Sequence, residues 1–391
     1  MNSFLRVSVI LVIACLTFGA FTIPVEFLQV RIFAHLKIAS CQLTAQKGTY
    51  RLLGDGNVVE KIQTRGDIRL VRVGDSIEAS QSDRRIGLFK YIRLIGGQSG
   101  ELRVKLQDPE RKPRYYQNNF SFSIVDSALR IINEVEMDNY IAGVTEAEAG
   151  PRSTYEFYKV QTILVRTFAL AHINKHINEG FSLCDLVHCQ AYYGRPVNPS
   201  IYKAVSATSG KVVVDENLNL INAAFHSNSG GQTANSEDVW GSRTSYLKSI
   251  VDTFSNRMPN SKWERRMLAD DWLQYLKLKH NYPVDDDSGR KVALSFRQDQ
   301  RKVFLEYSNA RVPLKNVRQD LQLKSTYFSI SRLGADSILI SGRGYGHGLG
   351  MCQEGAMCMA KRGYSYMEIL NFYYQNIQLI DLHKLSFFKD E

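Results

Sequence analysis

The sequence is poor in cysteine, in long apolar runs and in internal repetition. Six cysteines in 391 residues are too few for a fold held together by disulfides. Only one apolar run, Val7 to Ile23, is long enough to consider as a membrane span, so a polytopic membrane protein is excluded. The hydrophobic fraction of 44% and the charged fraction of 23% exclude wholesale disorder. The length predicts a globular protein of two or three domains.

Signatures of nucleic-acid recognition are also missing. The chain has 49 Lys and Arg against 39 Asp and Glu, a net charge of +10, which favours anionic partners such as nucleic acid, anionic lipid or cell-wall carboxylates. The basic residues are scattered, however, and no zinc-finger spacing, RNP aromatic motif or basic zipper is present. We therefore expect no nucleic-acid partner.

Residues 1–30 are predicted to be a signal peptide or membrane anchor rather than part of the fold. Arg6 precedes the apolar run, as in a targeting segment. Gly19-Ala20 is a weak cleavage site, and the residues before Cys15 loosely match a lipobox. An anchor, a cleaved signal and a lipoprotein all stay open. Each places the rest of the chain outside the cytoplasm, in the cell envelope.

The remaining pattern predicts an α+β fold. Residues 31–120 alternate apolar and polar residues between Gly-rich turns, which indicates a β-rich N-terminal module. Residues 121–253 and 336–391 mix helices and strands and are predicted to form the two parts of one catalytic core with a cleft. The more polar stretch 254–335 is interpreted as an inserted α/β segment.

Two capping boxes predict where helices begin. Ser153-x-x-Glu156 precedes an apolar stripe that predicts a helix to about His176. Ser365-x-x-Glu368 predicts a second helix, to about Gln375. Before them, Tyr140 to Val144 is predicted to be a short helix or turn.

Four potential metal ligands lie within fourteen positions: His176, Cys184, His188 and Cys189. Zinc prefers four nitrogen and sulfur ligands in a tetrahedron, and four protein ligands would leave no open position, so this Zn²⁺ would be structural. His172 lies one helical turn before His176 and is an alternative ligand. A Cys184–Cys189 disulfide and free thiols are the other interpretations, because an exported chain permits disulfides.

Glu146 and Glu148 precede the long predicted helix. Two residues that are two apart point to opposite sides of an extended chain, so the spacing does not itself indicate a catalytic pair. A carboxylate near a helix start ordinarily stabilises the helix dipole. From spacing alone, this ordinary interpretation is favoured.

Two polar, Gly-rich stretches are candidates for lining a cleft. The first runs from His226 to Thr233. Its neighbouring His226 and Ser227 suggest a serine hydrolase, but no nucleophile-elbow motif is present, so a loop lining a sugar or peptide cleft is the better interpretation. The second, Gly342 to Gly348, lacks the Gly-Lys-Ser/Thr ending of a phosphate loop. Its glycines suit close backbone approach to a ligand, which makes a site role for His347 plausible.

Six motifs occur in a fixed order: YIAGVTEAEAG, EFYKVQTILVRTFAL, CQAYYG, HSNSGGQT, VWGSRTSYLKSIVD and GRGYGHGLGMCQEGAMCMAKRGYSYMEILNFYY. Together they closely resemble the bacterial SpoIID/LytB family, over about 121–252 and 338–379. The resemblance implies a membrane-anchored lytic transglycosylase of peptidoglycan. Such an enzyme cleaves MurNAc–GlcNAc bonds in glycan strands whose stem peptides an amidase has removed, and leaves 1,6-anhydroMurNAc ends.

The resemblance also implies roles for individual residues. The catalytic glutamate of the family corresponds to Glu148, and Arg166 matches a helix position where it would orient substrate carboxylates or stabilise charge. The substrate-binding residues would be His226, Ser227, Gln232, His347 and Gln353. The family's zinc site, with its adjacent His-Cys pair, corresponds to His176, Cys184, His188 and Cys189.

Two other functions remain open at this point. LytB-like relatives are described as amidase enhancers, which bind the wall or a partner N-acetylmuramoyl-L-alanine amidase without needing Glu148. A metal-dependent wall amidase would require a water-bearing metal. The Cys/His group and Glu148 favour the transglycosylase. Sporulation, cell division and wall remodelling all fit as its setting.

Overall fold

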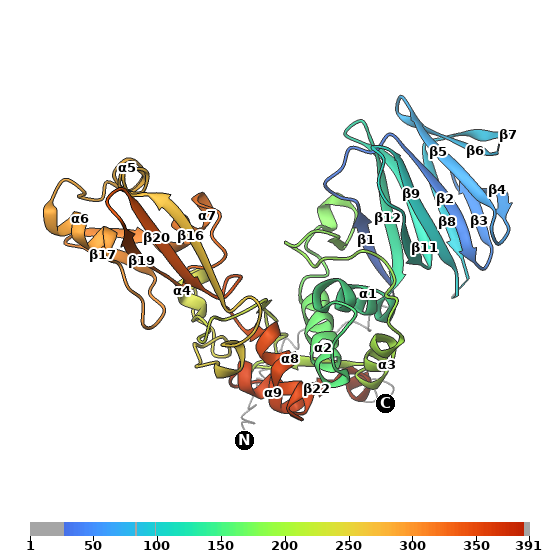
Figure 1. The fold of residues 1–391 in the computed structure, drawn as a ribbon. Coiled ribbons are helices and arrows are strands. Elements are labelled where there is room, and N and C mark those ends of the chain that lie inside the picture. The colour runs from blue at the N-terminus through green and yellow to red at the C-terminus, as the bar shows by residue number, and fades with distance from the viewer. Residues whose placement is uncertain (1–26, 83, 98, 387–391) are drawn as a thin grey trace, which may run out of the picture.

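The computed structural model describes residues 27–82, 84–97 and 99–386 (Figure 1). The apolar run Val7 to Ile23, predicted to be an anchor or signal, lies outside these residues. No helix in the described part of the chain is long and apolar enough to cross a bilayer. The described residues combine helices and strands, which confirms the α+β prediction.

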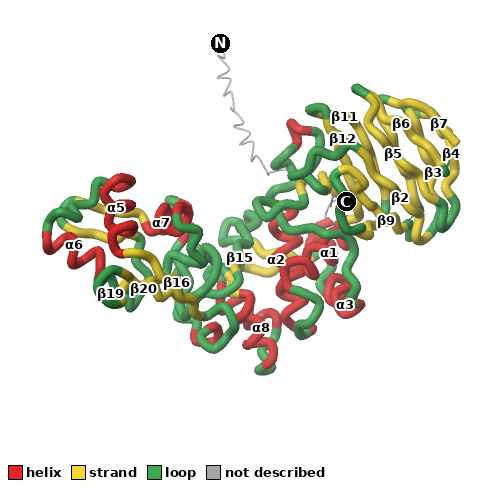
Figure 2. The backbone as a smooth tube through the Cα atoms, turned by 45° about the horizontal axis from the view of Figure 1, so that its top comes forward, coloured by secondary structure: helices red, strands yellow, loops and turns green. Residues whose placement is uncertain are grey.

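The described chain forms a V with three parts (Figure 1). One arm is a β-sheet module, the base is helical, and the other arm is a small α/β unit; Figure 2 shows the base helices lying between the two strand-rich arms. The strands of the sheet module are β1 (Phe27–Ile32), β2 (Ser40–Lys47), β3 (Tyr50–Gly54), β4 (Asn57–Ile62), β5 (Asp67–Val73), β6 (Ser76–Gln81), β7 (Arg84–Phe89), β8 (Tyr91–Gly96), β9 (Glu101–Asp108), β10 (Arg114–Gln117), β11 (Asn119–Val125) and β12 (Ala128–Glu136).

These strands form two sheets. The first has the order β13-β1-β12-β11-β8-β3-β4 and the second the order β10-β9-β2-β5-β6-β7. The edge strand β13 (Leu183–Cys184) comes from much later in the chain and pairs in parallel with β1, with Cys184 opposite Arg31. Part of the predicted metal site is therefore fixed to the edge of a sheet.

The base holds the helices that follow the sheets. They are α1 (Met137–Ala149), α2 (Tyr155–Ala171), the 3-10 turn Ile177–Glu179, α3 (Pro199–Ala207), α4 (Ser236–Trp240), the 3-10 turn Thr253–Ser255, α8 (Gln353–Lys361), α9 (Tyr366–Tyr373) and α10 (Leu382–Ser386). Short strand pairs close the base: β14 (Lys211–Val214) with β22 (Gln378–Asp381), and β15 (Phe225–His226) with β21 (Met351–Cys352).

One apolar core runs from the sheets into the base. Tyr192 joins the two regions, because its ring lies 5.6 Å from that of Tyr116 in β10 and 5.0 Å from that of Tyr140 in α1. All three side chains are fully buried. The sheet module and the helices therefore bury their apolar faces together.

The second arm has a core of its own, built around Trp272 and Phe328. Its strand β20, which lies beyond the expected end of the insertion at 335, adds Ile338 and Ile340 to this core. Its three-stranded sheet has the order β16-β20-β19. The elements of this arm are β16 (Lys262–Leu268), α5 (Ala269–His280), α6 (Asp287–Leu294), β17 (Phe304–Tyr307), β18 (Ala310–Pro313), α7 (Leu314–Asp320), β19 (Phe328–Leu333) and β20 (Ser337–Arg343).

The helix starts bear out one capping box and correct the other. Ser365 and Glu368 form the predicted box at the start of α9. The box at Ser153 is wrong, because Thr154 is the N-cap of α2 and accepts the amide hydrogen of Phe157. Glu156 instead accepts the amide hydrogen of Tyr366, which joins α2 to α9.

Gly143 explains why α1 is longer than the predicted turn at Tyr140 to Val144. Glycine in mid-helix ordinarily weakens a helix by about 1 kcal/mol relative to alanine, so the pattern favours a short element. Here the missing side chain is required, because a Cβ at Gly143 would collide with the main-chain oxygen of Gly194 and the ring of Tyr192. Close packing thus stabilises a helix that propensity alone disfavours.

We expect Gly143→Ala to lower the free energy of unfolding by about 1–3 kcal/mol, because overpacking outweighs the better helix propensity. Urea denaturation followed by circular dichroism measures this change. Gly97→Ala is the matched control, since a Cβ there meets no atom within 4 Å. An unchanged or higher stability of the Gly143 variant would contradict this packing.

Candidate functional site

Glu148 lies in the last turn of α1, where three separate parts of the chain meet. Its Oε1 accepts a hydrogen bond from the amide of Ala191 at 3.0 Å. The side-chain amide of Gln353, the first residue of α8, donates to the main-chain oxygen of Glu148 at 3.2 Å and lies 3.5 Å from Gln161 Oε1 of α2. The fold thus brings Glu148 and Gln353, both predicted site residues, into contact.

The carboxyl group of Glu148 is suited to holding a proton. Burial raises its pKa above the ordinary value, and the hydrogen bond from Ala191 offsets only part of that rise. The C-terminal end of a helix also carries partial negative charge, which disfavours an ionised carboxylate there. A carboxylic acid with a raised pKa is the form needed for general-acid catalysis.

Glu146 has different partners, on another side of α1. Its carboxylate accepts hydrogen bonds from the amide of Val197 at 2.9 and 3.1 Å and from that of Asn198 at 3.0 Å. Residues two apart on a helix do not face one another. Both glutamates lie at the end of α1 rather than at the start of α2, so the interpretation as dipole-stabilising residues is wrong. Glu146 instead holds the segment that leads into α3.

The four predicted metal ligands come together as one group. The donor atoms of His176, Cys184, His188 and Cys189 all lie within 4.8 Å of one another. His176 Nε2 lies 3.3 Å from Cys189 Sγ, and His188 Nε2 lies 3.3 Å from Cys184 Sγ. Neighbouring nitrogen and sulfur ligands of a tetrahedral zinc ion lie about 3.3–3.8 Å apart, given its bond lengths. The donor set and its spacing therefore fit a small tetrahedral ion.

Two alternatives to this ligand set, a Cys184–Cys189 disulfide and His172 as a ligand, are not formed in the structure. Cys184 and Cys189 are free thiols. A hydrogen bond from Cys184 lowers the pKa of Cys189 to about 5, while the pKa of Cys184 is raised. His172 lies outside the group, because its Nδ1 contacts the main-chain oxygen of Phe168 at 3.0 Å and its ring stacks on that residue.

Glu179 is a residue of this group that the sequence analysis did not identify. Its carboxylate lies 2.5 Å from His176 Nδ1, which leaves Nε2 to face the thiols. A carboxylate that binds the outer nitrogen of a ligating histidine fixes its orientation and tautomer. Its position three residues after His176 is the sequence feature that could have identified it.

The metal group lies next along the chain to Ala191, whose amide binds Glu148. Cys189 and Ala191 are separated only by Gln190, which accepts a hydrogen bond from the Tyr140 hydroxyl of α1 at 3.2 Å. The position of Cys189 thus determines that of the amide that holds Glu148. An ion that orders the Cys/His group would therefore also order the hydrogen bond from Ala191 to the Glu148 carboxyl.

Arg166 lies away from Glu148. Its buried guanidinium donates to the main-chain oxygens of Thr208 at 2.7 Å and Lys211 at 3.2 Å, and to Asp138 at 3.2 Å. Asp138 is ten residues before Glu148 in α1, a distance of about 15 Å along the helix axis. The structure therefore makes Arg166 a link between α1, α2 and β14, and its role in catalysis stays a prediction.

The four residues from the two Gly-rich stretches lie together, but their side chains mostly bind the protein itself. His226 is buried, its Nδ1 contacts the oxygen of Leu349 at 3.0 Å, and its ring lies 5.6 Å from that of His347. Ser227 Oγ contacts Asn260 at 3.4 Å, and no hydrogen bond joins it to His226 within the described chain. Gln232 donates to Ser249 at 3.0 Å.

Arg301, from the second arm, is a further residue that the sequence did not single out. Its guanidinium donates to the main-chain oxygens of Gln232 at 2.6 Å and Ser229 at 2.7 Å. It also lies about 3.0 Å from where a Cβ of Gly348 would be. Arg301 thus joins the two Gly-rich stretches, and nothing in its local sequence predicts this role.

Comparison with known proteins supports the resemblance to the SpoIID family. The family model described as Stage II sporulation protein (SpoIID) matches residues 125–214. Residues 125–214 are thus similar to the SpoIID domain. The matched segment spans Glu148, Arg166 and the whole Cys/His group, and ends with β14.

Relatives extend the SpoIID likeness beyond the domain. Stage II sporulation protein D of Bacillus subtilis is 28% identical over 276 residues, which are 66% of this chain and 78% of that protein. The protein of the same name from Bacillus amyloliquefaciens is 27% identical over 68% of this chain and 81% of its own length. An amidase enhancer of Bacillus subtilis is 31% identical over 61% of this chain, but only 40% of the enhancer is covered.

The raised pKa of Glu148 predicts an effect on stability. A carboxyl whose folded-state pKa is raised contributes stability below its unfolded pKa, about 4.3, and loses it as the pH rises through the folded value. We therefore expect Glu148→Gln to have a higher Tm than the wild type at pH 7, and the two to converge near pH 4. Thermal denaturation across this pH range measures the difference.

Glu146→Gln is the matched control for this experiment. Its carboxylate accepts three hydrogen bonds from main-chain amides, so an amide group there leaves some of them unmet and lowers the Tm. If both variants shifted the Tm in the same direction at pH 7, the assigned environment of Glu148 would be wrong.

Proposed function

We propose that this protein is a lytic transglycosylase of peptidoglycan that acts on the outer side of the cytoplasmic membrane. The substrate would be a glycan strand freed of stem peptides by an amidase, and the cleaved bond would join MurNAc to GlcNAc. The SpoIID domain and the amidase-enhancer relative support a role at the cell wall. The N-terminal apolar segment would hold the protein at the membrane. Sporulation, cell division or wall remodelling would be the setting.

The observation that carries this proposal is the half-buried carboxyl of Glu148, whose pKa is raised by burial. Glycosidases that use water ordinarily need two carboxyl groups facing the scissile bond. The nearest acidic residue in sequence, Glu146, is bound to the amides of Val197 and Asn198. A reaction that needs one carboxyl therefore fits this arrangement better than hydrolysis.

The transglycosylase reaction needs only one such group. The protonated Glu148 gives its proton to the glycosidic oxygen as the bond to C1 of MurNAc breaks, which releases the 4-hydroxyl of GlcNAc. The C6 hydroxyl of the same MurNAc then attacks C1, and the carboxylate of Glu148 takes its proton. The product is a 1,6-anhydro ring, and the enzyme returns to its starting protonation state.

We also propose that the Cys/His group holds a structural Zn²⁺. His176, Cys184, His188 and Cys189 would be its four ligands, which leaves no position for water. When bound, the ion would stabilise the fold by joining its four ligands and would not take part in the reaction. A metal-dependent amidase is disfavoured for this reason. The ordered loop then presents the amide of Ala191 to Glu148.

A non-catalytic amidase enhancer is the second candidate. The relative with that name, 31% identical over 61% of this chain, favours it. Such a protein would use the same fold to bind the wall or an amidase. Its activity would not depend on the protonation of Glu148.

We expect the full-length protein in detergent to release anhydroMurNAc-ended fragments from amidase-treated glycan strands. Glu148→Gln should lose at least about 100-fold in rate, the usual contribution of a general acid. The rate should fall as the pH rises through the raised pKa of Glu148, because only the protonated form gives the proton. Mass spectrometry of the products measures both effects.

Glu146→Gln should keep its cleavage activity and serves as the control. Hydrated reducing ends would instead indicate a hydrolase with a second carboxylate. No cleavage, with glycan binding equal in wild type and Glu148→Gln, would favour the amidase enhancer.

Metal analysis tests the zinc proposal separately. We expect one zinc per chain in the purified protein, and loss of both the zinc and several degrees of Tm in Cys189→Ser. Glu179→Ala should weaken zinc affinity about 10–100-fold, because it removes the support of His176. Cys358→Ser, a thiol outside the group, should keep the metal. Full metal binding in Cys189→Ser would overturn the ligand assignment.

A further inference from the structure

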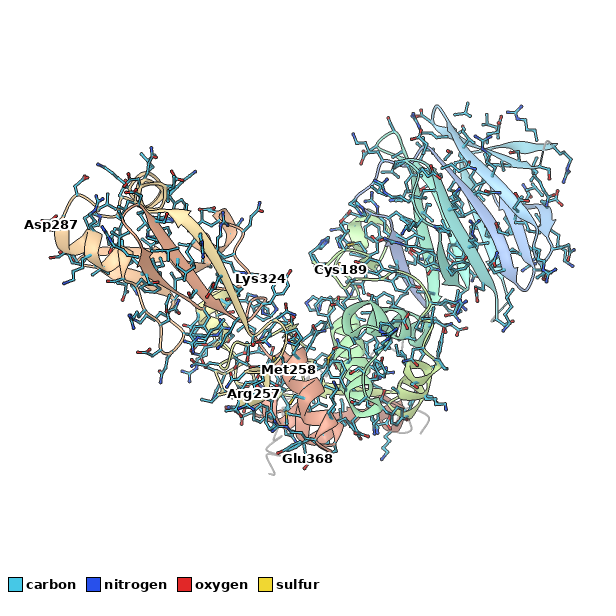
Figure 3. All side chains as sticks on the ribbon, viewed as in Figure 1. Cys189, Arg257, Met258, Asp287, Lys324 and Glu368 are labelled. Atoms are coloured by element: carbon cyan, nitrogen blue, oxygen red, sulfur yellow. The ribbon has the colours of Figure 1, made fainter. Side chains whose placement is uncertain are left out.

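A pocket of about 270 Å³ lies between α4 and the second arm, and Glu148 does not line it. Its walls come from α4, from residues 301–304 and from the start and end of α7. In Figure 1, α7 lies on the side of the second arm that faces the sheet module. Figure 3 shows Lys324 on that same side, across the V from Cys189.

Positive charge predominates among the residues that line this pocket. They include four cations, Arg301, Lys302, Lys315 and Arg318, but only two carboxylates, those of Glu237 and Asp238. No ion pair involving any of these four cations is formed among the residues that the structure describes. The Asp238 carboxylate instead accepts a hydrogen bond from Asn235 at 2.9 Å.

The two guanidinium groups have unused hydrogen-bonding capacity. Arg318 Nε is buried and has no hydrogen-bond partner within the described chain. Arg301 donates to Gln232, Ser229 and Thr326, which uses three of the five N–H groups of a guanidinium. A buried cation without a counter-ion costs free energy, and a bound anion would remove this cost.

Two histidines beside the pocket have pKa values that reflect the same positive charge. Burial and the charges of Arg318 and Arg301 lower the pKa of His347, a lining residue, to about 4. The pKa of His226 is lowered well below its ordinary value by burial, and His347 and Arg301 add to this effect. The field therefore extends from the second arm to both Gly-rich stretches.

The pocket also has an apolar wall. Val239, Val303, Phe304 and Leu314 contribute carbon surface next to the cations. At about 270 Å³ the pocket is at the small end of ligand sites, with room for one sugar ring or a short organic acid. Cations beside a carbon wall suit a carboxylate attached to a small apolar group.

We propose that this pocket binds the lactyl ether of a muramic acid residue, with its carboxylate against Arg318 and Arg301 and its methyl group against the apolar wall. This inference rests on the proposed function, since it takes the ligand to be a glycan strand. An amide-linked stem peptide removes the charge of that carboxylate. The pocket would therefore distinguish a bare muramic acid from a substituted one, at a subsite separate from Glu148.

Binding of defined sugars tests this pocket. The full-length protein in detergent, carrying Glu148→Gln, is titrated with a GlcNAc–MurNAc tetrasaccharide and with the same tetrasaccharide whose lactyl carboxylates are converted to primary amides. We expect the carboxylate form to bind about tenfold more tightly at fixed ionic strength, as a charge-assisted hydrogen bond provides. Isothermal titration calorimetry measures both affinities.

Variants of Arg318 test whether this residue causes the preference for the carboxylate form. Arg318→Gln should abolish the preference for the carboxylate form, and Arg318→Lys should keep most of it. Arg332→Gln, which removes an exposed charge of the same arm outside the pocket, should leave the preference unchanged. Equal Tm values for the three variants show that each is folded.

Two results would overturn the inference: equal binding of both tetrasaccharides, or an unchanged preference in Arg318→Gln. Cleavage is measured separately on wild type and the Arg318 variants. If the wild type cleaved no strands but still preferred the carboxylate form, the transglycosylase proposal would end and the pocket proposal would stand. Normal cleavage without any preference for the carboxylate form would end the pocket proposal and leave the transglycosylase proposal standing.

Discussion

The hydrogen bond from the Ala191 amide to Glu148 is the contact on which the site depends. It joins the end of α1 to a loop whose other end carries the Cys/His group, and that loop begins at a strand on the edge of the first sheet. Glu148 is therefore held at two points besides its own helix: the loop binds its carboxyl, and Gln353 binds its main-chain oxygen. Its raised pKa is a result of this enclosure, because burial contributes more than the amide offsets.

Much of this arrangement can be predicted from the sequence. The Cys/His group is indicated by spacing, because all but His176 lie within six residues, although spacing leaves His172 and a disulfide open. Strands such as β5 follow from strict alternation, and α9 from its capping box. These features are local, so local chemistry is enough to predict them.

The missed features depend on contacts between distant residues. Gly143 favours a short element by its low helix propensity, and only its close packing against Tyr192 and Gly194 explains the longer helix α1. The contacts of the Arg166 guanidinium with the main-chain oxygens of Thr208 and Lys211 join residues more than 40 positions apart, so the local sequence does not predict them. Arg301 lies in a stretch without a motif, and its importance appears only where the second arm meets the Gly-rich stretches.

The two arms differ in how they are attached, and this has a mechanical consequence. The sheet module shares its core with the base through Tyr116, Tyr192 and Tyr140, so it cannot rotate without opening that core. The second arm has a separate core and is joined to the base by two chain crossings, near 256–261 and 344–346, and by Arg301. Any change in the angle of the V would therefore concentrate at that one junction, where Arg301 binds Gln232 and Ser229 and the amide of Gly346 donates to the oxygen of Lys324.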